Sequence, residues 1–248
     1  MNRPSGKVKR TRPAAWSTWV TVPLSPAAQA EPKASSARPV PTFAVGAAGR
    51  VRFTFPLGRF ISAMAAARGD VWVAFYDASY LVRIQPETHT TVKVPLDSTP
   101  QARGPRAGAN GLAYGAGAFW VARIGGEVER LDPVSGRITA HIPVPGGNPA
   151  AFAAGHVWVA NKDSGVISRI DPRTNRVTAR VSVPTEACCL AAGPDGIFVS
   201  SYSRGLVSRI SRDGRVVDAF HVDGPASDIA YGDGRLWISG LASRGRRR

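Results

Sequence analysis

Residues 149–183 read P-A-A-F-A-A-G-H-V-W-V-A-N-K-D-S-G-V-I-S-R-I-D-P-R-T-N-R-V-T-A-R-V-S-V. This segment holds four short strand-like runs separated by turn residues: 151–154, 157–161, 166–170 and 177–183. Short apolar runs bounded by Gly, Pro, Asn and Asp are typical of β-strands joined by tight turns. The segment therefore predicts one compact unit of four strands.

Related units lie on both sides of this segment. Each contains an aromatic residue inside an apolar run, at Trp72, Trp120, Trp158, Phe198 and Trp237. The spacings are 48, 38, 40 and 39 residues, and a period near 40 with several short strands per unit is typical of β-propeller blades. The first interval is longer because a Pro/Gly/Arg-rich loop is inserted at 97–109. We expect the five aromatic residues to pack in the core between blades.

Strands with matching patterns flank each aromatic marker. First strands are predicted at 62–66, 110–115, 150–155, 188–193 and 227–232, third strands at 81–84, 128–131, 166–170 and 206–210, and fourth strands at 91–96, 138–144, 177–183 and 216–222. The second strands are apolar on both faces of the pleat, which is expected when a sheet is sandwiched between neighbouring sheets.

The two ends of the repeat region are irregular. Residues 49–57 resemble a fourth strand with no blade before it, and 243–245 match the start of a third strand. We therefore predict an all-β fold: a β-propeller of about 40-residue four-stranded blades, four complete plus a partial fifth, truncated or incompletely closed. The alternative is a five-bladed ring in which 49–57 completes the last blade. The predicted division is a disordered, basic, Ala/Pro-rich leader at 1–45 and a propeller domain at 46–248.

The formal net charge of +15 belongs mostly to the tails. Residues 1–50 contribute +7, residues 244–248 contribute +4, and the body between them is only mildly basic. Basic tails can contact nucleic acid or anionic membranes, but solvated, disordered segments are the favoured interpretation. Nucleic acid is therefore an unlikely partner except through the tails.

The leader also contains a weak candidate signal peptide. Its charged region would be 7–12, its apolar region 14–24 and its cleavage site 28–30. This pattern predicts a secreted or cell-envelope protein, with a cytoplasmic location as the alternative. No run approaches the 18 apolar residues of a membrane span, so no transmembrane helix is predicted.

The unit V-W-V-A-N-x-x-x-G-x-I-S-R-I-D-P-x-T-x-x-V at 157–177 resembles the YVTN-type propeller repeat. It is also similar to the repeats of virginiamycin B lyase-like (streptogramin lyase-like) propellers, over about residues 49–245. That family implies a metal-assisted elimination with His and Glu residues lining the central channel. Here the histidines fall in predicted turns (His89, His156) and outer strands (His141, His221). No catalytic residue is carried over, and no catalytic, metal or cofactor site is predicted.

Candidate binding residues lie at the channel mouth and on the rims. In the first strands, Asn110 and Asp228 offer polar chemistry, and adjacent Cys188 and Cys189 are expected to be buried small residues because neighbouring cysteines strain a disulfide. The rim candidates between second and third strands are Arg123, Lys162, Asp163, Tyr202 and Arg204. Arg103 and Arg106 mark the inserted loop as a candidate recognition loop. Solvated loops and local turn hydrogen bonds are the alternatives.

The sequence also lacks the common catalytic and nucleotide-binding motifs. It has no P-loop, H-E-x-x-H, C-x-x-C, G-x-S-x-G or EF-hand pattern. We therefore predict a non-enzymatic module that binds a protein, carbohydrate or small-molecule ligand through its rim loops. The alternative is a virginiamycin B lyase-like carbon–oxygen lyase without recognisable catalytic residues.

Overall fold

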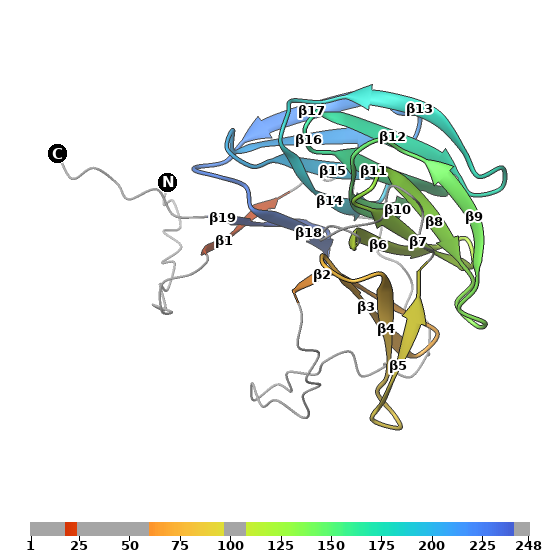
Figure 1. Ribbon diagram of the computed structural model, residues 1–248. Coiled ribbons are helices and arrows are strands. Elements are labelled where there is room, and N and C mark those ends of the chain that lie inside the picture. The colour runs from red at the N-terminus through yellow and green to blue at the C-terminus, as the bar shows by residue number, and fades with distance from the viewer. Residues whose placement is uncertain (1–17, 24–59, 97–107, 241–248) are drawn as a thin grey trace, which may run out of the picture.

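The computed structural model describes residues 18–23, 60–96 and 108–240. Within these ranges the chain forms strands β1 to β19 and no helix, so no helical segment there is long and apolar enough to cross a membrane. The strands form four four-stranded antiparallel sheets and one three-stranded sheet (Figure 1).

Each four-stranded sheet is one blade and uses four consecutive strands. Blade 1 contains β2 (Ile61–Ala67), β3 (Asp70–Phe75), β4 (Tyr80–Gln85) and β5 (Thr90–Pro95). Blade 2 contains β6 (Ala109–Gly115), β7 (Ala118–Arg123), β8 (Glu127–Leu131) and β9 (Ile138–Pro143). Blade 3 contains β10 (Gly147–Ala153), β11 (His156–Asn161), β12 (Val166–Asp171) and β13 (Arg176–Ser182). Blade 4 contains β14 (Ala187–Gly193), β15 (Gly196–Ser201), β16 (Leu206–Ser211) and β17 (Val216–His221).

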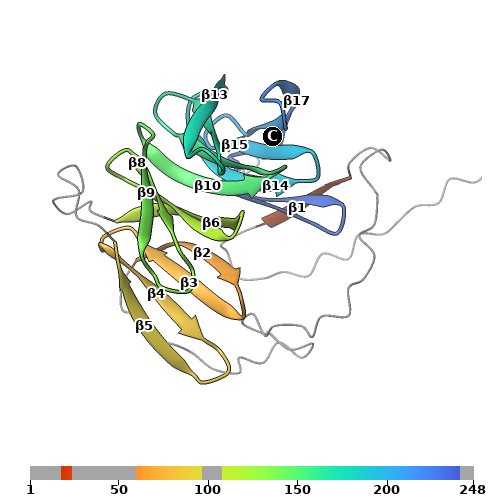
Figure 2. The same cartoon turned by 90° about the vertical axis from the view of Figure 1, so that its right-hand side faces the viewer.

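The first strands of successive blades lie next to one another. β2 contacts β6, β6 contacts β10, β10 contacts β14, and β14 contacts β18 (Asp228–Gly232). The fourth strands lie at the outside of the arc (Figure 2). This arrangement confirms the predicted all-β propeller with four complete blades and a partial fifth. Among the described residues, the sheets do not close into a ring.

The second strands form the core because each is buried on both faces. In β11, Trp158 packs toward blade 4 beside Ile197, while Val157 and Val159 pack toward blade 2 beside Trp120. The buried indole of Trp158 donates to the Ala153 carbonyl at 3.2 Å, so its polar group is satisfied. Trp72, Trp120, Trp158 and Phe198 are core residues as predicted. Trp237 in the last sheet is only half-buried.

An arginine on the third strand covers each core tryptophan. The guanidinium carbons of Arg83, Arg130 and Arg169 lie 5.7, 5.2 and 5.9 Å from the ring centroids of Trp72, Trp120 and Trp158. Arg130 Nη1 also donates to the Pro172 carbonyl at 3.1 Å, and Arg169 Nη1 donates to the Arg212 carbonyl at 2.7 Å. In blades 2 and 3 the arginine therefore ties its own blade to a turn of the next one.

The fifth sheet differs from the prediction. β19 (Arg235–Gly240) pairs with β18 on one side and with β1 (Thr18–Pro23) on the other, antiparallel, with Thr18 opposite Gly240. β1 thus occupies the place that a third strand has in blades 1 to 4. Residues 18–23 therefore form a strand within the segment predicted to be a disordered leader. The strand predicted at 49–57 and the chain end after 240 lie outside the described residues.

Candidate functional site

The two polar residues predicted at the channel mouth lie in first strands. Asn110 is a half-buried residue in β6, at a register shift between Ala109 and Gly111. Asp228 begins β18 and is exposed, and its Oδ1 accepts a hydrogen bond from the Ile229 backbone N–H at 2.8 Å. The Asp228 carboxylate therefore makes a local backbone hydrogen bond, which is the predicted alternative to ligand binding.

Polar side chains in the first strands also join neighbouring blades. Ser62 Oγ donates to the Ala109 carbonyl at 2.5 Å, from blade 1 to blade 2. Cys188 occupies the corresponding position in blade 4, and its Sγ lies 3.5 Å from the Ala226 carbonyl, just before blade 5. In both blades the side chain contributes to packing of the inner strands, which accounts for its polarity without a ligand.

Cys188 and Cys189 are free thiols and both are half-buried, not fully buried as expected. A hydrogen bond between the two sulfurs lowers the pKa of Cys188 to about 7, although burial opposes this change. The same hydrogen bond, together with burial, raises the pKa of Cys189. Cys189 Sγ lies 3.0 Å from the Ser227 carbonyl, where it can donate.

Four rim candidates gather where blades 3 and 4 meet. They are exposed residues in the β11–β12 and β15–β16 turns: Lys162, Asp163, Tyr202 and Arg204. The loop between β13 and β14 lies between these turns, because Glu186 N donates to the Lys162 carbonyl at 2.8 Å and the Glu186 carbonyl accepts from Tyr202 N at 3.1 Å. We call Lys162, Asp163, Glu186, Tyr202 and Arg204 the blade 3–4 rim.

The sequence analysis missed Glu186, which organises this rim. Its Oε2 accepts hydrogen bonds from the backbone N–H of Ser203, at 3.1 Å, and from the Ser203 hydroxyl. These bonds lower the pKa of Glu186, and the nearby cations Arg204 and Lys162 add to the effect. The signal was available: in an antiparallel blade, the connection to the next blade emerges at the same end as the turn between second and third strands.

Arg123 is not part of the rim, contrary to the prediction. It is the last residue of β7, and its side chain is fully buried. Its Nη1 lies 2.7 Å from Oε1 of Glu129, whose side chain is also fully buried. Arg123 therefore belongs to an internal ion pair and cannot form a solvated partner surface. The other predicted arginines, Arg103 and Arg106, lie outside the described residues.

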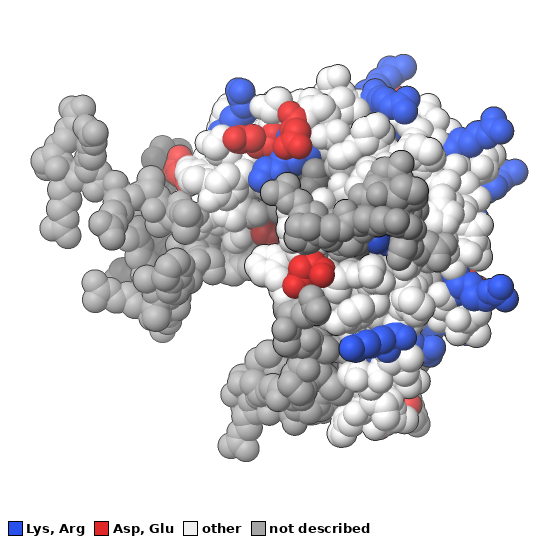
Figure 3. All heavy atoms as spheres, in the orientation of Figure 1, with Lys and Arg blue, Asp and Glu red and all other residues white. Residues whose placement is uncertain are grey.

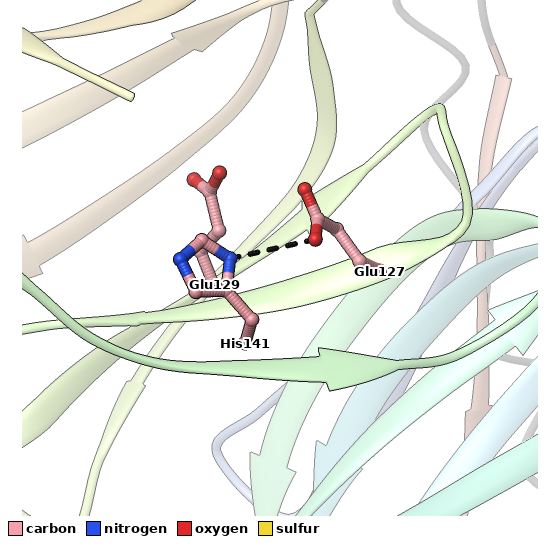
Figure 4. A group of neighbouring side chains, drawn as sticks. All are labelled: Glu127, Glu129 and His141. Carbon is pink, nitrogen blue, oxygen red and sulfur yellow. Dashed lines mark ion pairs between the residues drawn. The ribbon is translucent and has the colours of Figure 1, made fainter. Parts of the chain in front are cut away.

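Two further polar side chains adjoin this buried pair. Glu127 and Glu129 are two residues apart on β8 and so project from the same face, and Glu129 lies directly opposite His141 on β9. His141 Nδ1 lies 3.4 Å from Glu127 Oε2. One ligand atom from each of Glu127, Glu129 and His141 lies within 4.8 Å of the others (Figure 4). We call these three residues the blade 2 cluster.

The blade 2 cluster contains a strongly perturbed carboxyl group. Burial raises the pKa of Glu129 to about 7, and the charge and hydrogen bond of Arg123 only partly offset this. The Glu127 carboxylate raises it further. Glu129 Oε1 faces Arg123, whereas Oε2 has no hydrogen-bond partner among the described residues. The cluster therefore combines two carboxylates and one imidazole. One of its oxygens, the buried Glu129 Oε2, has no hydrogen-bond partner among the described residues.

The sequence carried a signal for this cluster too. At the position of Glu129, the other complete blades have Val82, Ser168 and Ser208, as their pairing with the fourth strands shows. A carboxylate at a fully buried strand position is unusual. Glu129 and His141 were missed because only first-strand residues were expected to line the channel.

Comparisons with known proteins place the fold. No family model matches the chain, and no curated protein matches it in sequence. Among solved structures it is similar to virginiamycin B lyase from Staphylococcus aureus, with a TM-score of 0.63, 14% identity and coverage of 79% of this chain and 72% of that one.

Two further structures are similar at a comparable level. For BamB from Moraxella catarrhalis the TM-score is 0.58 at 13% identity, over 77% of this chain and 64% of that one. For Kuenenia stuttgartiensis hydrazine synthase it is 0.54 at 13% identity, over 64% and 47%. At such low identity these likenesses show the fold alone: a β-propeller similar to those of virginiamycin B lyase and BamB.

Proposed function

We propose that the chain is a non-enzymatic β-propeller that binds a protein partner through the blade 3–4 rim. The observation that carries this proposal is the set of bonds from Glu186 to Lys162, Tyr202 and Ser203, which connect the turns of two blades. Tyr202 and Arg204 are exposed on these connected turns. Tyr and Arg are the residue types that often contribute most to binding, and a preorganised surface loses little entropy when it binds.

The turns of the rim are also fixed from within each blade. Val183 N donates to the Gly165 carbonyl and Val222 N to the Gly205 carbonyl, both at 2.8 Å. Gly165 has a φ of +65°, and a Cβ there would lie 2.4 Å from the Val183 carbonyl oxygen. The close approach requires glycine and holds the β11–β12 turn against the end of β13. The rim therefore presents its side chains from restrained backbone.

The charges of the blade 3–4 rim favour a protein partner over a polyanionic partner. Lys162 and Arg204 stand beside Asp163 and Glu186, so both signs are present within one small surface. In the view of Figure 3, basic side chains are spread along the outer edge and also lie beside the grouped acidic ones, so this view shows no broad basic patch. Nucleic-acid binding instead requires a basic stripe or patch. Carbohydrate and small-molecule ligands remain the alternatives predicted from sequence.

The lyase alternative lacks support from the first strands. Across β2, β6, β10, β14 and β18 of the described chain there is no His and no Glu. His141 and His221 lie in outer strands as predicted, and His156 begins β11, where its Nδ1 lies 3.0 Å from the Ala154 carbonyl. In these described first strands, the fold likeness to virginiamycin B lyase therefore comes without the His and Glu side chains that the family resemblance implies for the channel.

An exported location remains a prediction, and β1 makes it testable. Cleavage after residue 30 would remove β1 and leave β19 with one partner strand. We expect the intact mass of the chain purified from its producing cells to show whether residues 18–23 are retained. Recovery of a chain beginning near residue 31 from outside the cytoplasm would support export.

A site-specific crosslinking experiment tests the binding proposal. A photo-reactive amino acid at position 202 in the full chain should give a discrete crosslinked protein in the producing cells. The same group at Val134, an exposed position in the β8–β9 turn away from the rim, is the matched control. Tyr202→Ala should weaken binding to the purified crosslinked protein about tenfold or more. Equal crosslinking at 134 and 202, or none at 202, would contradict the proposal.

A further inference from the structure

We propose that the blade 2 cluster is a binding site for a divalent transition-metal cation, best matched by Zn²⁺. Its ligands would be one carboxylate oxygen from Glu127, one from Glu129 and one imidazole nitrogen from His141, which lie within 4.8 Å of one another. This site goes beyond the proposed function, because it shares no residue with the blade 3–4 rim.

The strand pair β8–β9 sets the ligand geometry. Glu127 and Glu129 lie on one face of β8, and His141 lies opposite Glu129 on β9. Figure 4 shows all three side chains on the same side of this strand pair, with the imidazole beside Glu129 and facing Glu127. Ligands carried by paired strands are held more precisely than ligands carried by loops.

Glu129 supplies an independent reason to expect a cation. Its side chain is fully buried, and its Oε2 has no hydrogen-bond partner in the part of the chain that the structure describes. More than about 90% of buried polar groups in proteins are satisfied, so an unsatisfied carboxylate oxygen calls for an explanation. A cation between Glu127, Glu129 and His141 would satisfy it directly.

Arg123 is compatible with this arrangement. It contacts Oε1 of Glu129 at 2.7 Å, so it orients the carboxylate and leaves Oε2 without a hydrogen bond among the described residues. With neutral His141, the two glutamates and Arg123 carry one net negative charge. A divalent cation would reverse this to one net positive charge, a smaller imbalance than a trivalent ion would leave. Orientation of a ligand by a second group is common in metal sites.

The ligand types decide which cation fits. One nitrogen and two oxygens form a mixed set that suits Zn²⁺ and its first-row neighbours, whereas Ca²⁺ and Mg²⁺ prefer sites built from oxygen alone. Zn²⁺ lies about 2.0–2.2 Å from N and O ligands, so tetrahedral ligands are roughly 3.3 Å apart. Separations within 4.8 Å therefore require only a modest closure of the side chains. The half-exposed His141 provides the route of entry.

The test is calorimetric titration of the chelator-treated full chain with ZnCl₂, and with CaCl₂ as the comparison cation. We expect one saturable Zn²⁺ site per chain and much weaker Ca²⁺ binding. Glu127→Gln and His141→Ala should each weaken Zn²⁺ binding about tenfold or more. His221→Ala is the matched control, because His221 lies in another outer strand, β17, and it should leave binding unchanged.

Two further measurements test whether the cation binds at the blade 2 cluster or at the two cysteines. Co²⁺ in the wild-type chain should give the visible absorption of a four-coordinate N/O site, which Zn²⁺ should abolish, without sulfur-to-metal bands. Cys188→Ser/Cys189→Ser should retain the site. Absence of saturable binding in the wild-type chain, equal binding in Glu127→Gln and His141→Ala, or loss in the cysteine variant would each overturn the proposal. Far-UV circular dichroism of each variant establishes that it is folded.

Discussion

Blades 2 and 3 share a backbone plan but differ on the face that each turns toward the preceding blade. Blade 2 places Arg123 and Glu129 there as a fully buried ion pair. At the equivalent positions blade 3 has Asn161 and Ser168. Asn161 helps to build its turn, because its Nδ2 donates to the Pro145 carbonyl at 2.9 Å and its Oδ1 accepts from backbone N–H groups. The two blades have the same scaffold with different polar chemistry on it.

This difference distinguishes residues that both blades need for packing from residues that are particular to blade 2. Trp120 and Trp158, with their covering arginines, are equivalent in the two blades and are part of the inter-blade packing. The buried ion pair occurs in blade 2 but not at the equivalent positions of blades 1, 3 and 4. Because a buried ion pair often stabilises no better than well-packed apolar residues, the requirements of the propeller do not account for it. Its position beside Glu127 and His141 makes blade 2 the place to look for specific chemistry.

The largest expected effect comes from breaking the ion pair. Glu129→Leu leaves the Arg123 guanidinium buried without its carboxylate, which should lower the free energy of unfolding by about 3–5 kcal/mol. In blade 3, Ser168→Ala removes a buried hydroxyl without leaving a charge and should cost about 1 kcal/mol. Urea unfolding of the two variants at pH 8 measures the difference directly.

A double variant shows whether the cost comes from the unpaired charge. Blade 1 has Phe75 and Val82 at the equivalent positions, and both are buried. Arg123→Phe/Glu129→Val should therefore recover most of the stability lost in Glu129→Leu. If the double variant is as unstable as the single one, lost packing explains the effect and the two blades differ less than their charges suggest.

Much of the fold could be predicted because its signals are local and repeated. The aromatic spacing and the Gly-containing turns located the strands of four blades to within a few residues. β1 was missed because its pairing with β19 joins residues more than two hundred positions apart, and nothing in T-W-V-T-V-P specifies that partner. Arg123 was misplaced because the side chain at a strand end can enter the core or the solvent. Glu129, which pairs with Arg123 in the core and so decides between these two placements, was not recognised as its partner.

A smaller effect should appear as a pH dependence particular to blade 2. Burial raises the pKa of Glu129 from 4.5 to about 7 in the folded chain, so the folded state binds more protons than the unfolded state between these values. This contribution to stability is present below about pH 4.5 and is lost as the pH rises through about 7. It amounts to on the order of 3 kcal/mol. Arg123, Glu127 and His141 are the charged or titratable groups that act on Glu129.

The measurement is the difference in unfolding free energy between wild type and Glu129→Gln at several pH values. Relative to the variant, the wild type should lose stability from pH 5 to pH 8. The difference isolates Glu129 from exposed acids such as Asp132 and Asp213, whose lowered pKa values act in the opposite direction. A flat difference would mean that Arg123 compensates for burial fully and that Glu129 ionises normally.

The smallest expected effect concerns the arginines that cover the core tryptophans, for which blades 2 and 3 should behave alike. Arg130 covers Trp120 and donates to the Pro172 carbonyl of blade 3, as Arg169 covers Trp158 and donates to the Arg212 carbonyl of blade 4. Arg130→Met and Arg169→Met should each lower the unfolding free energy by about 1 kcal/mol, through loss of the cation–π contact and one hydrogen bond.

Arg209 of blade 4 is the matched control for these two arginines. It lies 3.7 Å from the exposed Asp195, an ion pair worth only a few tenths of a kcal/mol, and its blade is followed by the three-stranded sheet of β1, β19 and β18. Arg209→Met should therefore cost less than either of the others. If all three variants are equally stable, the bonds to the next blade contribute nothing measurable. Packing between blades would then depend on the Trp and Val faces. Of the charged contacts compared, only the buried Arg123–Glu129 ion pair would have a substantial effect on stability.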